Sequence, residues 1–261
     1  MRHGLGKVAA GLLAVCLVAA TAACGGGDSG ARSGSAAAQT EELQGARIAT
    51  SLSARVKDVL ERYQGNISAN QKAILERALA NDGVVTKADY ELAWSNFQQC
   101  LADKGYAPMV TTMYQGGVHG TTMSMDVGGR GEEVERKVTD DTTACITLER
   151  DYVDQLYRSA LGNPGLYQDA DTGLMDCLRR KDLVAVSYTP STYKEESAKV
   201  DELYADYVDE AGDIDGSWSR ATSEGYSFDY DDPDVMLCYV ANGSDPKSQT
   251  PDGAVTWKPF G

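Results

Sequence analysis

Cysteine is the residue type in this chain whose possible chemistry is most narrowly defined, and six cysteines occur. Cys16 and Cys24 lie near the N-terminus, and the other four are far apart in the rest of the chain. Structural zinc needs closely paired cysteines or histidines, and no C-x-x-C motif occurs. In an exported protein, four cysteines favour two disulfides over reduced, buried thiols. Of the three possible pairings we expect Cys100–Cys145 and Cys177–Cys238, each adding up to about 4 kcal/mol of stability in the chain-entropy model.

Histidine is the second residue type that could do chemistry. The chain has two histidines, and only His119 lies beyond the N-terminal segment. A nucleophile–histidine site would therefore have to use it. His119 lies among glycines in an expected turn, so we predict a surface turn residue with no supporting residues around it. No G-x-S-x-G motif or phosphate-binding glycine loop occurs, and the sequence predicts no catalytic residue, metal or cofactor.

Carboxylates are abundant, with 39 Asp and Glu residues. A pair of them could perform glycosidase-type hydrolysis, but the sequence does not select the pair. Residues 195–234 hold 14 acidic residues, two basic residues and several aromatic residues. This stretch fits an amphipathic helix whose tyrosines face the core. It also fits a binding surface, because aromatic faces stack on sugars and cations while carboxylates accept hydrogen bonds.

The candidate binding surface on this stretch has five aromatic residues: Tyr204, Tyr207, Trp218, Tyr226 and Tyr230. Its expected partners are an envelope protein, a cell-wall glycan or Ca²⁺. Weak Ca²⁺ binding would use four carboxylates: Asp229, Asp231, Asp232 and Asp234.

The net charge excludes some partners. The chain has 24 basic and 39 acidic residues and a net charge of -15, and its first 23 residues contain two basic and no acidic residues. The remainder therefore has a net charge of -17. Such a protein is repelled by nucleic-acid backbones and by anionic lipid head groups. Surface adsorption cannot hold it at a membrane, so membrane attachment would need an anchor.

The N-terminal segment is typical of a signal peptide. A basic start precedes the apolar run Val8–Ala20, which is too short to span a bilayer easily. The run ends in Thr21-Ala22-Ala23-Cys24, which resembles the lipobox of bacterial lipoproteins, although that pattern usually has Leu where Thr21 stands. The resemblance implies removal of residues 1–23 and a diacylglycerol on Cys24. Residues 24–40 then form a Gly/Ser/Ala-rich flexible linker.

Apolar periodicity predicts a mainly α fold with a minor β part, formed by a single helical domain over residues 41–241. Three cap signals, at Ser68, Thr86 and Thr192, are expected to begin helices, as is the Asp-Pro pair at residues 232 and 233. Other predicted elements are a helix over 139–160, a short helix near 174–178, a β-hairpin insert over 106–131 and a strand over 183–188. An irregular acidic stretch before residue 232 and a polar tail over 242–261 complete the prediction.

One segment also resembles known proteins. Asp89-Tyr90, Trp94, Phe97, Cys100-Leu101 and Gly105-Tyr106, followed by a cysteine on a later helix, resemble uncharacterised secreted lipoproteins of Gram-positive (actinobacterial-type) bacteria. The resemblance implies a lipid-anchored protein on the extracytoplasmic face of the cell membrane and no assigned reaction. The resulting hypothesis is a non-enzymatic binding or envelope-structural module, and the alternative is a cell-envelope hydrolase that uses acidic residues.

Overall fold

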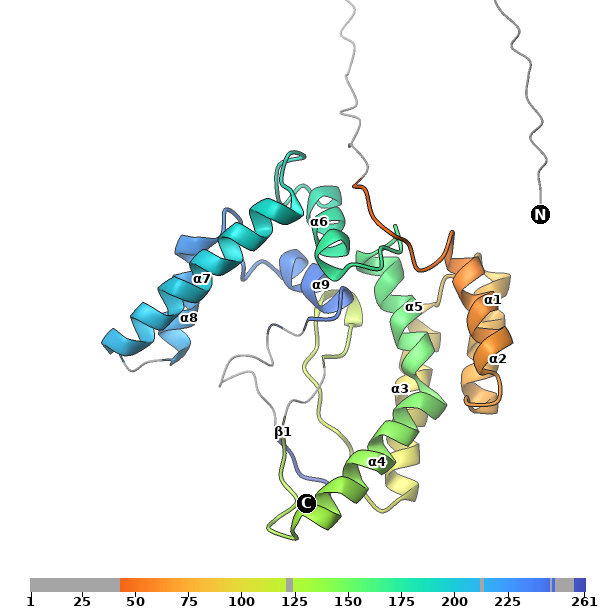
Figure 1. Ribbon diagram of the computed structural model, residues 1–261. Coiled ribbons are helices and arrows are strands. Elements are labelled where there is room, and N and C mark those ends of the chain that lie inside the picture. Colours follow the sequence, from red (N-terminus) through yellow and green to blue (C-terminus); the bar gives the residue numbers. More distant parts are fainter. Residues whose placement is uncertain (1–42, 121–123, 212–213, 245, 247–255) are drawn as a thin grey trace, which may run out of the picture. The chain divides into compact units, whose positions relative to one another are not determined.

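The computed structural model describes residues 43–261, except 121–123, 212–213, 245 and 247–255 (Figure 1). For residues 209–211 and 214–215 only the backbone is described. The predicted signal peptide, Cys24 and the whole predicted linker lie outside the described residues. No helix in the described ranges is long and apolar enough to cross a membrane.

Nine α-helices occur in the described part of the chain, which confirms the mainly helical class. Their bounds are α1 Leu52–Tyr63, α2 Ala69–Ala80, α3 Lys87–Asp103, α4 Glu132–Glu149, α5 Asp151–Gly162, α6 Ala170–Arg180, α7 Pro190–Ala211, α8 Ile214–Gly225 and α9 Pro233–Ala241. The other elements are the 3-10 turn η1 Gln115–Gly117 and the two-residue strands β1 Ser124–Met125 and β2 Thr256–Trp257.

Helix starts follow the predicted cap signals in three of four cases. The hydroxyls of Ser68 and Thr86 accept the backbone N–H groups of Gln71 and Asp89, and a side-chain oxygen of Asp232 accepts the N–H of Asp234 at the start of α9. These bonds satisfy N–H groups that have no partner within the helix. The fourth signal was misplaced, because α7 is capped one turn earlier, where the Thr189 hydroxyl accepts the N–H of Thr192.

The minor β part differs from a regular hairpin. Within the expected hairpin region, an antiparallel bridge joins Met113 to His119 around η1. Strand β1 pairs in parallel with β2 near the C-terminus. Trp257 of β2 is buried and packs with the residues of the first hydrophobic cluster. The last residues of the expected polar tail therefore belong to the folded domain, because they contribute core surface.

Three local predictions were wrong. The expected helix over 139–160 is broken at Arg150, whose φ of -140° is not helical, and two helices result. The expected strand over 183–188 consists of turns, because Leu183 N–H closes the end of α6 on the Leu178 carbonyl. The expected irregular acidic stretch contains α8, which packs along α7. At the Arg150 break a distant residue takes part, because Gln71 of α2 donates to the Thr147 and Leu148 carbonyls and accepts the Tyr152 N–H.

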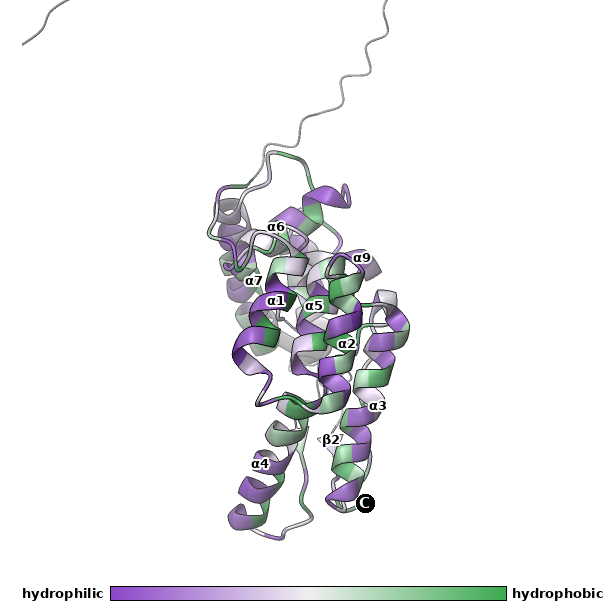
Figure 2. Cartoon of the chain, turned by 90° about the vertical axis from the view of Figure 1, so that its right-hand side faces the viewer, coloured by the Kyte–Doolittle hydropathy of each residue, from purple (hydrophilic) through white to green (hydrophobic). Residues whose placement is uncertain are grey.

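The core consists of two hydrophobic clusters. The first is formed by α1–α5, the loop around η1, Leu237 and Val240 of α9, and Trp257. The second is formed by α6, the loop after α8 and the other buried residues of α9. Met236 of α9 packs against both clusters. In Figure 2, hydrophobic and hydrophilic residues alternate along α3, as expected for a helix that buries one face.

Both predicted disulfides are confirmed, and each lies with one cluster. Cys100–Cys145 joins α3 to α4, and Cys177–Cys238 joins α6 to α9. Their Cα atoms are 5.8 and 5.6 Å apart, within the normal range for disulfides. Each bond closes a long loop and reduces the conformational freedom of the unfolded chain.

Candidate functional site

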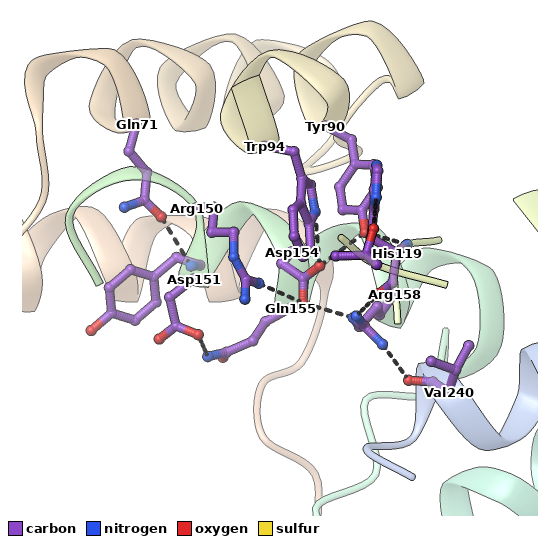
Figure 3. A network of polar contacts seen from close by, with 12 residues as sticks. Gln71, Tyr90, Trp94, His119, Arg150, Asp151, Asp154, Gln155, Arg158 and Val240 are labelled. Atoms are coloured by element: carbon purple, nitrogen blue, oxygen red, sulfur yellow. Dashed lines mark hydrogen bonds and ion pairs between the residues drawn. The ribbon is translucent and has the colours of Figure 1, made fainter. Parts of the chain in front are cut away.

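A buried charged network, centred on Asp154 of α5, lies in the first cluster (Figure 3). The Asp154 carboxylate accepts hydrogen bonds from the Tyr90 hydroxyl at 2.9 Å, from Trp94 Nε1 at 3.3 Å and from Arg158 Nε at 2.7 Å. The Arg150 guanidinium lies 3.8 Å from the same carboxylate and 3.9 Å from the centre of the Trp94 ring. One buried acid is therefore shared by two arginines and two aromatic donors.

His119 is part of this network, so the prediction of an unsupported surface turn residue was wrong. Its side chain is 14% exposed, and its ring stacks on Trp94 with centroids 4.4 Å apart. Nδ1 lies 2.9 Å from the Thr111 hydroxyl and Nε2 lies 3.1 Å from a carboxylate oxygen of Glu91. The His119 backbone N–H donates to the Tyr90 hydroxyl. Contacts from α3 and from Thr111 thus hold a residue that the sequence places in a glycine-rich turn.

The order hydroxyl, imidazole, carboxylate is the order that activates nucleophiles in hydrolases. Thr111, His119 and Glu91 are bonded in this order, and Arg158 of α5 also donates to the His119 carbonyl. These contacts fix the 111–120 loop to α3 and α5. We therefore assign His119 and Asp154 a structural role, in which the buried charges are paired and hydrogen-bonded.

Burial shapes the ionisation of this network. The pKa of Tyr90 is raised far above its ordinary value, mainly by burial and next by the negative charge of Asp154. Burial lowers the pKa of Arg150, and the charge of Asp154 opposes that effect. Tyr90 therefore remains a neutral donor to Asp154 at any physiological pH.

The five aromatic residues predicted as a binding surface lie on α7, α8 and the loop after α8. Trp218 makes edge contacts with Tyr204 at 5.4 Å and with Tyr230 at 5.9 Å between ring centroids. Tyr226 stacks on Tyr230 at 5.6 Å. Tyr207 is apart from this group: its hydroxyl donates to Glu224, and the Arg220 guanidinium covers its ring. Four of the five residues therefore form one aromatic cluster.

This cluster is largely core. Tyr230 is 7% exposed, and Trp218, Tyr226 and Tyr204 are half-buried. Burial raises the pKa of Tyr226 to about 12 and raises that of Tyr230 further. The interpretation of tyrosines that face the core therefore describes most of the cluster, while one edge of it remains open.

At that edge lies the aromatic cavity, with a volume of about 240 Å³. Its walls include two predicted binding residues together with residues from the η1 loop, the loop after α8 and α9. The lining residues are Trp218, Tyr230, Tyr114, Gln115, Asp231, Pro233, Met236 and, after α9, Pro246. Sequence reasoning missed Tyr114 and Gln115, because about a hundred residues separate them from Trp218 and no local pattern links the two segments.

The Trp218 indole is the unusual group at this cavity. Its Nε1 is shielded from solvent and has no hydrogen-bond partner in the described structure. The other two tryptophans have partners: Trp94 Nε1 donates to Asp154, and Trp257 Nε1 donates to the Ala107 carbonyl. A buried indole N–H usually finds an acceptor, and leaving one unpaired costs about 1–3 kcal/mol.

The carboxylates considered for Ca²⁺ have other partners. A side-chain oxygen of Asp229 accepts the N–H of Asp231, one of Asp232 caps α9, and one of Asp234 pairs with Lys181 at 2.6 Å. In the described ranges, no group of three or more His, Cys, Asp or Glu residues is placed to hold a metal ion. Asp231 is exposed at the cavity wall, and no ion pair of its side chain is found among the described residues.

A second, polar cavity of about 400 Å³ lies between α2, α3 and the end of α4. Its walls include Asn96, Asp103 and Glu149. Asp103 is exposed and accepts from Gln99, while Glu149 accepts from Ser68 at 2.8 Å. This cavity brings two carboxylates together without an apolar environment around them.

Comparisons with known proteins add no relatives. No protein family, curated protein or solved structure matches the chain. The functional argument therefore rests on the residues of this chain alone.

Proposed function

We propose that this protein is a lipid-anchored binding protein on the extracytoplasmic face of the cell membrane, and that the aromatic cavity is its ligand site. Cys24 would be the anchor and residues 25–39 the tether. The aromatic lining of that cavity, with Tyr114, Trp218 and Tyr230 in its walls, is the observation that carries the binding part of the proposal.

Two observations support the location. The sequence Thr21-Ala22-Ala23-Cys24 has the small residues and the cysteine of a lipobox. All four remaining cysteines form disulfides, a pattern typical of proteins that fold in an oxidising compartment. A strongly acidic domain also needs such an anchor to stay near anionic lipids.

The composition of the aromatic cavity supports a binding role. Ligand sites are mainly apolar and aromatic with a few directed polar groups. Here Trp218, Tyr230 and Met236 supply apolar surface, while Gln115 and Asp231 supply polar groups. The cavity is small, so it suits a single ring or a compact chain rather than a large ligand.

The anchor is tested by replacing Cys24 with Ala and separating membrane from medium. We expect the wild-type protein in the membrane fraction, with the mass of a lipidated chain that starts at Cys24. The Cys24→Ala variant should appear in the medium or stay unprocessed. The matched control is Cys16→Ala, which should remain processed and membrane-bound. A cleaved Cys24→Ala protein that stays in the membrane would refute the anchor.

The binding role is tested by thermal unfolding of the protein with soluble cell-wall fragments and small envelope metabolites. A true ligand should raise the melting temperature of the wild type, because it binds only the folded state. The same ligand should raise that of Trp218→Ala less, because this variant lacks the ring that lines the cavity. Melting shifts that are equal in both proteins would show that the cavity is not the site.

A hydrolase is the second candidate, favoured by Asp103 and Glu149 in the polar cavity. Glycosidases use two carboxylates, one of which must stay protonated, and burial in apolar surroundings usually achieves that. Asp103 is exposed and Glu149 is hydrogen-bonded, so the arrangement supports this function less well. Hydrolysis of a cell-wall glycan by the wild type and its loss in Glu149→Gln would establish this activity instead.

A further inference from the structure

We infer that the loop between α6 and α7, residues 181–189, rests on the lipid bilayer, with Val186 in contact with lipid. Its partner is a membrane surface that contains anionic phospholipid. The inference rests on the location part of the proposed function and goes beyond it. Lipid on Cys24 would attach the protein, and the loop would determine which end of the domain faces the membrane.

The composition of this loop is unusual for a surface connection. Its residues Leu183-Val184-Ala185-Val186 are all apolar, whereas exposed loops are normally polar. Leu183 and Val184 are half-buried and pack against the second hydrophobic cluster. Ala185 is exposed, and Val186 is 40% exposed. Core packing therefore accounts for the first two residues of the run and leaves the other two at the surface.

Hydrogen bonds hold the loop at both of its ends. The Leu183 N–H donates to the Leu178 carbonyl at the end of α6. The buried Arg179 side chain donates through Nε to the Tyr188 carbonyl at 2.7 Å, and the Tyr188 N–H donates to the Ala185 carbonyl. A loop fixed in this way presents its exposed residues in one arrangement, so binding requires little further ordering.

The charge near the loop differs from that of the acidic stretch that follows. Residues 177–194 contain four basic residues and one acidic residue, whereas residues 195–234 contain 14 acidic and two basic residues. Arg180 and Lys194, on either side of the loop, have side chains that are 54% and 67% exposed, in ion pairs with Asp176 and Asp171. Basic side chains near a membrane are attracted to anionic head groups. The loop thus combines exposed apolar surface with neighbouring cations.

The position of the loop favours lipid as its partner. Leu43, the first described residue, packs against the same hydrophobic cluster as the loop, and its carbonyl accepts from the Tyr167 hydroxyl at 2.9 Å. Figure 1 shows the start of the described chain and the α6–α7 loop at the same, upper end of the domain. Residues 25–42 would link Leu43 to the lipid, and a flexible chain of that length spans about 21–25 Å. Such a short link keeps the bilayer at a high local concentration beside this end of the domain.

The contact is tested with the full-length lipidated protein, purified in detergent and reconstituted into vesicles of phosphatidylglycerol and phosphatidylcholine. Brominated acyl chains in these vesicles quench tryptophan that touches them. Val186→Trp places the reporter in the loop, and Leu92→Trp, at a 46% exposed position on α3, is the matched control. Relative to the wild type, the quenching added by Val186→Trp should be at least about threefold that added by Leu92→Trp, although any tryptophan favours the interface.

A second pair of variants tests the attraction to anionic lipid. In the Val186→Trp protein, Arg180→Gln should lower the ratio of lipid-inserted to free loop about twofold to fivefold. The effect should be absent in vesicles of phosphatidylcholine alone. Lys72→Gln is the matched control, since Lys72 is 43% exposed and forms an ion pair within α2, and it should change nothing. Melting temperatures confirm that each variant is folded.

Flotation of the vesicles separates the inference from the proposed location. If the wild type floats with the vesicles and Val186→Trp is quenched no more than Leu92→Trp, the loop does not contact lipid. The inference then falls, a protein partner becomes the alternative occupant, and the location stands. Equal effects of Arg180→Gln and Lys72→Gln would also overturn the inference, because the cations beside the loop would have no role. If the wild type does not float, the location and the inference both fall.

Discussion

Trp94 and Trp218 lie in the two hydrophobic halves of the domain and have opposite polar surroundings. Trp94 is 3% exposed, with its N–H bonded to Asp154 and its ring next to Arg150 and His119. Trp218 is half-buried at the wall of the aromatic cavity, and its N–H has no partner in the described ranges. The first arrangement is internally complete and stabilises the fold. The second leaves part of an aromatic side chain exposed at a cavity wall, which suits a ligand site.

The largest predicted effect tests the buried network of Asp154 around Trp94. Asp154→Ala leaves Arg150 and Arg158 without their shared carboxylate in a buried site, and removing one partner of a buried ion pair costs about 3–5 kcal/mol. Urea unfolding should show this loss in the free energy of unfolding. The control Asp58→Ala removes a more exposed acid paired with Arg55 and Arg62, and should cost about 1 kcal/mol or less. Similar values for the two variants would contradict the structural role of Asp154.

The next prediction is a matched pair of substitutions at the two tryptophans. Trp94→Phe removes a bonded N–H and part of a fully packed ring, so we expect a loss of about 2 kcal/mol in the free energy of unfolding. Trp218→Phe removes an N–H that has no partner and should cost about 1 kcal/mol or less. Chemical unfolding of both variants measures the difference. A larger loss at Trp218 would reverse the comparison.

His119 provides a smaller and more local test. His119→Ala removes the contacts of the ring with Thr111, Glu91 and Trp94, with an expected cost of about 1–2 kcal/mol. The 111–120 loop should then open more often, which hydrogen exchange of the Tyr114 and Gly120 amides can detect. Exchange rates equal to those of the wild type would show that the loop is held without the imidazole.

The smallest predicted effects are pH-dependent and differ between the halves. Hydrogen bonds from Lys137, Tyr106 and Lys104 lower the pKa of Asp141 in the first half. A lowered folded-state pKa gives stability above the unfolded-state pKa, near 3.9, that is lost as pH falls toward the folded-state value. In the second half, burial raises the pKa of Tyr226 to about 12. That stability is complete below the unfolded-state pKa, near 10, and is lost as pH rises toward 12.

Single-tryptophan variants separate these two pH effects. Emission from Trp94 should report the acid-induced loss, and emission from Trp218 should report the alkaline loss. Asp141→Asn should abolish the contribution of Asp141 to the loss of stability at acidic pH. Tyr226→Phe should abolish the contribution of Tyr226 to the loss of stability at alkaline pH. Identical pH profiles at both tryptophans would show that the two halves respond as one unit.

The sequence determined the local and pairwise features of this protein. Cap residues such as Ser68 and Thr86 define helix starts because they bond to N–H groups three residues away. The cysteine pairs followed from their even number and from their positions relative to the predicted helices. The predicted lipobox at residues 21–24, which lies outside the described residues and stays a prediction, is likewise a local motif. Caps and motifs depend on residues that are close in the chain. The cysteine pairs could be chosen because only three pairings were possible.

Tertiary structure alone decided the rest. His119 is held in place because Glu91 and Trp94 of α3 and Arg158 of α5 contact it. The aromatic cavity exists only because the η1 loop lies against α9, which brings Tyr114 and Gln115 near Trp218. Burial and hydrogen bonding between distant segments are set by packing, and packing free energy depends on the whole chain rather than on any short pattern.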